Sequence, residues 1–118
     1  MRLINQTKNT ILAEDVFIAR TPFQRIKGLL GKKRFSSGQA IILEPCNSVH
    51  TFFMCFPIDV LFADKNNSVV KTVRQMRPFR VTGICLKSKF IIELPAGVID
   101  ASKTSVGDSI TKQGQTPS

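Results

Sequence analysis

The chain has 118 residues, and its 17 Lys+Arg against 8 Asp+Glu give a formal net charge of +9. This length predicts one compact domain, which we place at residues 1–112, and a hydrophobic content of 42% excludes a disordered chain. A cationic protein attracts anions, so the composition leaves a small anionic ligand, an acidic protein partner and nucleic acid open as partners.

The sequence contains no pattern typical of a membrane span, a metal site or a common cofactor site. No stretch approaches the roughly 20 apolar residues that cross a bilayer, and the amino-terminal residues lack the apolar core of a signal peptide, so we expect a cytoplasmic protein without a transmembrane segment. Cys46, Cys55 and Cys85 are widely spaced, odd in number and without a CxxC pair, which favours reduced thiols. One histidine and three scattered cysteines offer no zinc spacing, and glycine-rich phosphate loops are missing from the sequence. We therefore expect no metal and no cofactor.

The first predicted element is a helix at about residues 22–30. Thr21 is a suitable N-cap, and Pro22 occupies the first helical position, where its missing N–H has no consequence. Gly31 follows as a stop. Between them, apolar residues recur with helical spacing at Phe23, Ile26, Leu29 and Leu30.

The remaining apolar runs are typical of strands. Residues 58–63 and 68–73 flank the Asp-Lys-Asn-Asn turn, which predicts a hairpin. Further short strands are expected at 41–43, at 90–94 and at the end of 106–110. The fold class is therefore mainly β, a small antiparallel barrel or sandwich with one short helix, and the tail 113–118 is expected to be disordered.

The segment Pro45–Val60 concentrates the residues that carry chemistry. It holds the single histidine, His50, and the carboxylate Asp59 within an apolar strand. If both faces of that strand are covered, Asp59 is buried and needs a donor or a cation. Glu93 repeats the pattern between apolar neighbours. The two carboxylates either cap turns or pair with arginine, or they form a polar site together with His50 or Arg25.

Three other functions compete with a polar binding site. His50 and Asp59 could act as an acid–base pair in a small hydrolase-like enzyme if they lie within hydrogen-bond reach. A Cys46–His50 dyad is disfavoured because four residues of extended strand span about 13 Å. Basic groups at residues 20–34 and 71–80 could bind a polyanion, but the sequence shows no obvious exposed aromatics that would stack on bases.

Four motifs occur in order along the chain. They are Arg-Ile-Lys-Gly-Leu-Leu-Gly from residue 25, Val-His-Thr-Phe-Phe-Met from 49 with Phe-Pro-Ile-Asp-Val-Leu-Phe from 56, Phe-Ile-Ile-Glu-Leu-Pro-Ala-Gly from 90, and Gly107-Asp108. In this the chain resembles the domain of unknown function 192 family, also called uncharacterised protein family 0127. The resemblance runs from about residue 13 to 110.

The resemblance implies a compact, mostly β fold and brings no established activity. It singles out two groups of residues. The candidate ligand-binding residues are Arg25, His50, Asp59 and Glu93, and the candidate structural residues are Gly28, Pro57, Pro95, Gly97 and Asp108. Our leading hypothesis is a non-catalytic binding or accessory module whose polar pocket is built from the central motif, residues 49–54 with 56–62.

Overall fold

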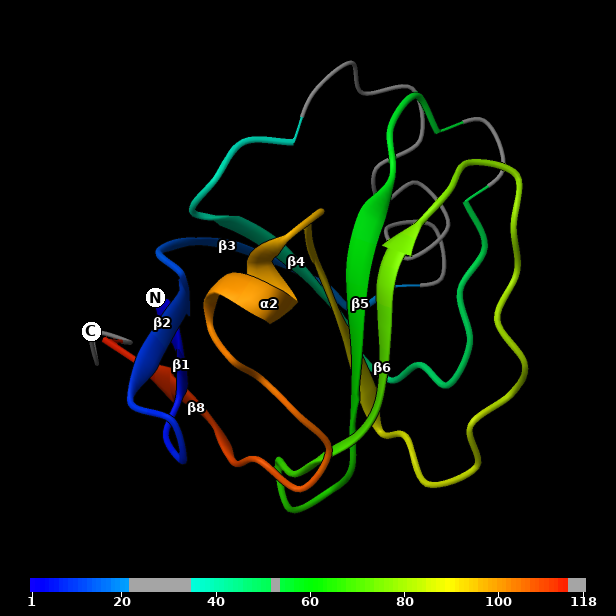
Figure 1. The fold of residues 1–118 in the computed structure, drawn as a ribbon. Coiled ribbons are helices and arrows are strands. Elements are labelled where there is room, and N and C mark those ends of the chain that lie inside the picture. Colours follow the sequence, from blue (N-terminus) through cyan, green and yellow to red (C-terminus); the bar gives the residue numbers. More distant parts are fainter. Residues whose placement is uncertain (22–34, 52–53, 115–118) are drawn as a thin grey trace.

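In the computed structural model the chain forms two β-sheets with a short helix beside them (Figure 1). The structure describes residues 1–21, 35–51 and 54–114. The elements are β1 (Arg2–Asn5), β2 (Thr10–Ala13), β3 (Asp15–Ala19), β4 (Gln39–Leu43), β5 (Ile58–Ala63), β6 (Val69–Met76), β7 (Phe90–Pro95), α2 (Val98–Ala101) and β8 (Ile110–Gln113). The prediction of a mainly β fold is confirmed, and the described residues include one short helix, α2.

The sheets are arranged as a sandwich. The smaller sheet has the order β2-β1-β8, and the larger has the order β3-β4-β7-β5-β6. Within the described residues β3 and β6 remain edge strands of the larger sheet, so the barrel alternative is wrong. The pairings are antiparallel except for β3 with β4, which run parallel from Asp15↔Gln39 to Ala19↔Leu43. A parallel pair cannot be joined by a hairpin turn, in agreement with the sequence separation between Ala19 and Gln39.

The predicted hairpin is formed by β5 and β6. Asp64 Oδ1 accepts hydrogen bonds from the amides of Asn66 and Ser68 at 2.9 and 3.0 Å, and Asn67 adopts a positive φ of 62°. Asparagine tolerates this left-handed conformation, so the turn residues explain where the chain reverses. The pairing Leu61↔Thr72 then sets the antiparallel register.

The larger sheet is apolar on both faces. Every residue of β5 and β7 is buried, because one face packs on the smaller sheet and α2 while the other carries a second core. The first core includes Leu3, Leu61, Ile92, Leu94 and Ile99. The second includes Ile58, Val60, Phe62, Met76 and Ile91. Burial on both faces explains why these strands are continuous apolar runs in the sequence.

The helix expected at about residues 22–30, with Arg25 and Gly28, lies outside the described residues. The helix that the structure describes is α2, which follows Gly97 at a positive φ of 99°. The sequence pattern after the strand at 90–94 predicts no helix, since Pro95 and Gly97 are typical turn residues. Among residues 1–21, 35–51 and 54–114, no helix combines the length and the apolar character that a membrane crossing requires.

Candidate functional site

Asp59 is a buried hydrogen-bond acceptor for the backbone. Its side chain lies on the face of β5 toward α2, and the residue is 1% exposed. Oδ1 accepts a hydrogen bond from the Gln75 amide at 2.8 Å, and Oδ2 accepts bonds from the amides of Gly97 and Ile99 at 3.0 and 2.8 Å. The donor that a buried carboxylate needs is therefore backbone N–H, and Asp59 ties β5 to β6 and α2.

This arrangement gives the acid–base hypothesis no support. Asp59 and His50 both belong to the described part of the chain, and no direct hydrogen bond joins their side chains. His50 is exposed and forms an isolated β-bridge with Val81. Because the Asp59 carboxylate accepts its hydrogen bonds from three backbone amides, it does not orient the imidazole.

Glu93 points away from Asp59. In the register of β5 and β7, Asp59 lies opposite Leu94, whereas Glu93 lies opposite Val60. Residues directly opposite one another share a face of the sheet, so an offset of one residue sends the two carboxylates to opposite faces. The expectation that Asp59 and Glu93 line one pocket is therefore wrong.

The carboxyl group of Glu93 is nearly sealed in the second core. The residue is 4% exposed, and within the described residues Oε1 has no hydrogen-bond partner. Burial raises the pKa of Glu93 from 4.5 to about 7, because an apolar environment disfavours the charged form. Near neutral pH the group therefore exists in both protonation states.

Thr51, next to His50, holds the chain that follows β6. Thr51 is fully buried. Its amide donates to the Arg80 carbonyl oxygen at 2.8 Å, and its Oγ1 accepts from the Arg80 amide at 2.9 Å and donates to the Arg77 carbonyl oxygen at 2.6 Å. The Phe79 amide donates to the Thr51 carbonyl oxygen at 2.9 Å. Thr51 belongs to the Val-His-Thr-Phe-Phe-Met motif, and its hydrogen-bonding role has no signal in the sequence.

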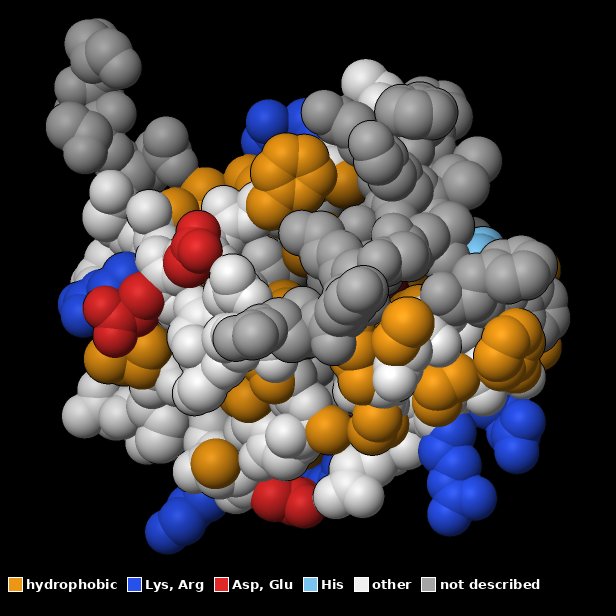
Figure 2. All heavy atoms as spheres, turned by 90° about the horizontal axis from the view of Figure 1, so that it is seen from above, with side chains coloured by type: hydrophobic (Ala, Val, Ile, Leu, Met, Phe, Trp, Pro, Cys, Tyr) orange, Lys and Arg blue, Asp and Glu red, His pale blue; other side chains and the backbone are white. Residues whose placement is uncertain are grey.

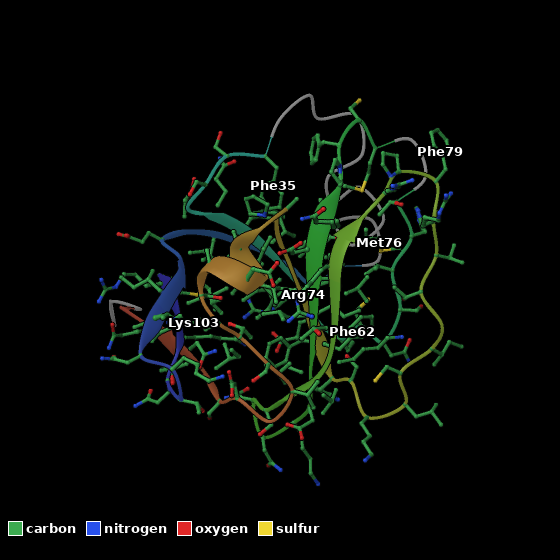
Figure 3. The ribbon with its side chains drawn as sticks, in the orientation of Figure 1. Phe35, Phe62, Arg74, Met76, Phe79 and Lys103 are labelled. Carbon is green, nitrogen blue, oxygen red and sulfur yellow. The ribbon has the colours of Figure 1, made fainter. Side chains whose placement is uncertain are left out.

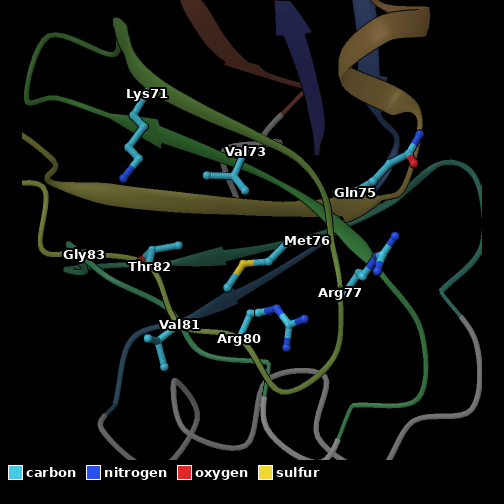
Figure 4. A pocket seen from close by; sticks show the side chains of 9 residues that line it. All are labelled: Lys71, Val73, Gln75, Met76, Arg77, Arg80, Val81, Thr82 and Gly83. Carbon is cyan, nitrogen blue, oxygen red and sulfur yellow. The ribbon is translucent and has the colours of Figure 1, made fainter.

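These contacts position the wall of a pocket beside β6. The cavity has a volume of about 550 Å³, within the range of small-molecule sites. Its lining residues come from β6 and from the chain after it (Figure 4): Lys71, Val73, Gln75, Met76, Arg77, Arg80, Val81, Thr82 and Gly83.

The pocket combines cationic and apolar side chains. Figure 4 shows Lys71 and Arg77 toward opposite ends of the pocket, with Met76 and Arg80 between them. Among the described residues, none of these three cations forms a salt bridge. The Lys71 Nζ lies 5.3 Å from the centre of the Phe62 ring, so the ammonium group forms a cation–π interaction with this ring.

Arg74 belongs to the other face of β6. Its Nε lies 2.7 Å from Asp100 Oδ1, and Figure 3 shows Arg74 between α2 and β6. The alternation of a strand separates it from Lys71, which faces the pocket. The basic group predicted at residues 71–80 is therefore divided, and only part of it serves the pocket.

Asp59 stabilises the bulge of β6 that forms part of the pocket wall. The register of β5 with β6 shifts between Ile58↔Met76 and Val60↔Val73, and within this bulge Gln75 has a positive φ of 49°. The amide of Gln75 donates the hydrogen bond that Asp59 Oδ1 accepts. A bulge of this kind redirects the side chains beside it, and here Gln75 and Met76 both line the cavity.

Asp108 stabilises the loop between α2 and β8. Its Oδ2 accepts hydrogen bonds from Asn5 Nδ2 and Lys8 Nζ at 2.9 Å and from the Ser105 amide at 3.0 Å. Burial opposes ionisation of Asp108, but these hydrogen bonds and the Lys8 charge outweigh burial and lower its pKa to about 2.

The candidate structural residues near β5 and β7 lie at the ends of strands or of α2. Pro57 immediately precedes β5, Pro95 ends β7 opposite Ile58, and Gly97 supplies the positive φ that starts α2. They frame the strands that carry Asp59 and Glu93.

The fold and pocket define a small two-sheet β-sandwich protein with a cation-lined cavity beside an edge strand, a class that by itself specifies no reaction. Residues 3–112 match the family model DUF192, described as "Uncharacterized ACR". The chain belongs to this family.

Related sequences agree with this assignment, and a solved structure shares the fold. A UPF0127 protein of Thermococcus sibiricus is 38% identical over 112 residues, which cover 92% of this chain and 72% of the relative. A UPF0127 protein of Pyrococcus horikoshii is 35% identical, with 92% and 96% covered. A crystal structure of a protein of unknown function from Novosphingobium aromaticivorans matches with a TM-score of 0.83 over 95% of this chain and 84% of that one. At 15% identity, this last similarity shows the fold alone.

Proposed function

We propose that the protein is a binding module for a small molecule that joins an anionic group to an apolar body, held in the pocket beside β6. The observation that carries the proposal is the joint position of Lys71, Arg77 and Arg80 around a cavity of about 550 Å³. Cations without an acidic partner among the described residues favour an anion.

The apolar lining supports the second half of the ligand. Val73 and Met76 extend the second core to the cavity, and Val81 adds an apolar side chain from the opposite wall. Sites that bind small molecules combine an apolar lining with a few placed polar groups, and this pocket has that composition. Inorganic phosphate alone would leave these apolar side chains unused.

Hydrogen bonds that fix the pocket wall are a further argument for a binding site. Thr51 fixes the backbone at Arg77 and Arg80, and Asp59 fixes it at Gln75. A site that is held before its ligand arrives loses less conformational freedom on binding.

The test compares three probes by isothermal titration calorimetry: phenyl phosphate, inorganic phosphate and phenol. We expect phenyl phosphate to bind more tightly than either fragment, because only it contacts both the cations and the apolar lining. Replacing a charged donor with Arg80→Ala should weaken binding about tenfold or more.

Arg74→Ala is the matched control, since it removes one charge from the same strand on the opposite face. We expect it to leave the affinity for phenyl phosphate unchanged. Absence of saturable binding, or an equal loss in the Arg74→Ala and Arg80→Ala variants, would contradict the proposal.

A further inference from the structure

The chain between β6 and β7 exposes an unusual number of apolar side chains. In residues 77–89, which we call the 77–89 segment, Phe79, Val81, Ile84 and Leu86 are 57%, 64%, 69% and 91% exposed. Isolated exposed apolar residues are ordinary, but four within eight positions concentrate exposed apolar side chains in one short segment, which we call the apolar patch. The segment runs along the outer side of the larger sheet (Figure 1), and Figure 3 shows Phe79 at the periphery of the molecule.

Positive charge accompanies this patch. No Asp or Glu occurs between Asp64 and Glu93. The same stretch contains the cations Lys65, Lys71, Arg74, Arg77, Arg80, Lys87 and Lys89. Four of them, all exposed, lie within the 77–89 segment and alternate there with the apolar residues. On the side of the molecule where Figure 1 places this segment, Figure 2 shows hydrophobic side chains next to Lys and Arg.

The backbone of the 77–89 segment is held in place. The amides of Thr82 and Cys85 donate to the carbonyl oxygens of Val49 and Asn47 at 2.9 and 2.8 Å. Near the beginning of the segment, Phe79 adopts a positive φ of 61° and donates its amide to Thr51. These bonds keep the segment along the outer side of the sheet, so its apolar side chains are presented to solvent by a braced backbone.

We propose that the 77–89 segment docks on the surface of an anionic lipid bilayer. Ile84 and Leu86 enter the boundary between headgroups and acyl chains, and Lys87 and Lys89 contact lipid phosphates. Apolar side chains that alternate with Lys and Arg at an exposed surface match this environment, where one layer is apolar and the next is negatively charged. A nucleic acid would use the cations and leave Ile84 and Leu86 in water.

The 77–89 segment also contributes to the pocket wall, from Arg77 to Gly83. The four residues assigned to the membrane do not line the pocket, so their variants test this inference separately: Ile84, Leu86, Lys87 and Lys89. The experiment is co-sedimentation of the whole protein with vesicles of phosphatidylcholine alone, or of phosphatidylcholine mixed with phosphatidylglycerol. We expect binding to the mixed vesicles only. It should weaken about tenfold in an Ile84→Ser/Leu86→Ser variant and also in a Lys87→Gln/Lys89→Gln variant.

Ile11→Ser is the matched control, since Ile11 is 50% exposed on a different sheet. Insertion itself is measured with Leu86→Trp, because the natural chain contains no Trp. Its emission should shift to the blue with mixed vesicles, and that of Ile11→Trp should not. Three results would overturn the proposal: no binding to mixed vesicles at low salt, full binding by Ile84→Ser/Leu86→Ser, or binding of polyglutamate without binding of vesicles, which would indicate an acidic protein partner.

Discussion

Thr51 and Arg80 are joined by two hydrogen bonds in opposite directions, from the Thr51 amide to the Arg80 carbonyl oxygen at 2.8 Å and from the Arg80 amide to Thr51 Oγ1 at 2.9 Å. The bonds connect a residue of the central motif to a cation of the pocket. Thr51 does not line the pocket, so the motif contributes to the candidate site by positioning the backbone of Arg80.

Replacing Thr51 by valine should lower both stability and affinity. The variant keeps the side-chain shape but leaves the Arg80 amide and the Arg77 carbonyl oxygen without their Oγ1 partner. We expect a loss of about 1–3 kcal/mol in the free energy of unfolding, measured with urea, and weaker binding of phenyl phosphate. Thr51→Ser retains the hydroxyl and should preserve both properties. Equal stability of the Val and Ser variants would contradict this role.

Asp59→Asn should destabilise the fold. Three backbone amides donate to the carboxylate, and an amide side chain has a single acceptor oxygen and turns an N–H donor toward one of them. We expect a loss on the order of 2–3 kcal/mol, because hydrogen bonds to charged groups contribute more than neutral ones.

Hydrogen exchange at the amides of Gln75, Gly97 and Ile99 would locate the Asp59 effect. The matched control is Asp15→Asn, since Asp15 is exposed on β3. If the Asp59→Asn variant retains full protection of these three amides, the linking role assigned to Asp59 is wrong.

Glu93 should make stability depend on pH near neutrality. Its pKa is raised from 4.5 to about 7 in the folded state, so folding retains a proton that the unfolded chain releases. The corresponding stability is fully present below pH 4.5 and is lost as the pH rises to about 7, by roughly 3 kcal/mol in total.

Glu93→Gln tests this dependence because the amide stays uncharged at every pH. Urea unfolding between pH 4.5 and 8 should show that the variant lacks the decline seen in the natural protein. Glu14→Gln, at an exposed position, should leave the decline intact. Parallel pH profiles of the natural protein and the Glu93→Gln variant would refute the assignment.

Asp108 should contribute in the opposite direction. Burial disfavours its charge, but hydrogen bonds from Asn5, Lys8 and Ser105 and the Lys8 charge prevail and lower its pKa from 3.8 to about 2. Its stabilising effect is therefore complete above pH 3.8 and declines as the pH falls toward 2. Asp108→Asn should be less stable at neutral pH and lose less stability on acidification. Asp100→Asn is the control, since the Asp100 side chain is 64% exposed.

The sequence predicted most of the larger sheet because its signals are local. The strand at 58–63, the turn after it and the strand at 90–94 are continuous apolar runs bounded by turn residues. The strands β1 and β2 were missed because each is a four-residue segment with polar neighbours. Their burial comes from packing on the larger sheet, which a local pattern does not contain.

The candidate site was predicted less well, for a geometric reason. Alternation within a strand shows that Asp59 and Glu93 each interrupt an apolar face, but it does not give the register between the two strands. Only the pairing Asp59↔Leu94 shows that the carboxylates diverge. The pocket has one signal in the sequence, because acidic residues are missing between Asp64 and Glu93.

The bulge at Gln75 has a consequence for the behaviour of the protein at high concentration. Among the described strands, β6 is an edge of the larger sheet, and a flat edge offers free backbone groups to a strand of another molecule. The positive φ of Gln75 bends this edge, and Asp59 holds the bend by binding the Gln75 amide. Lys71 and Arg74 add charge to the same strand. The irregularity that forms the pocket therefore also protects the sheet against edge-to-edge aggregation.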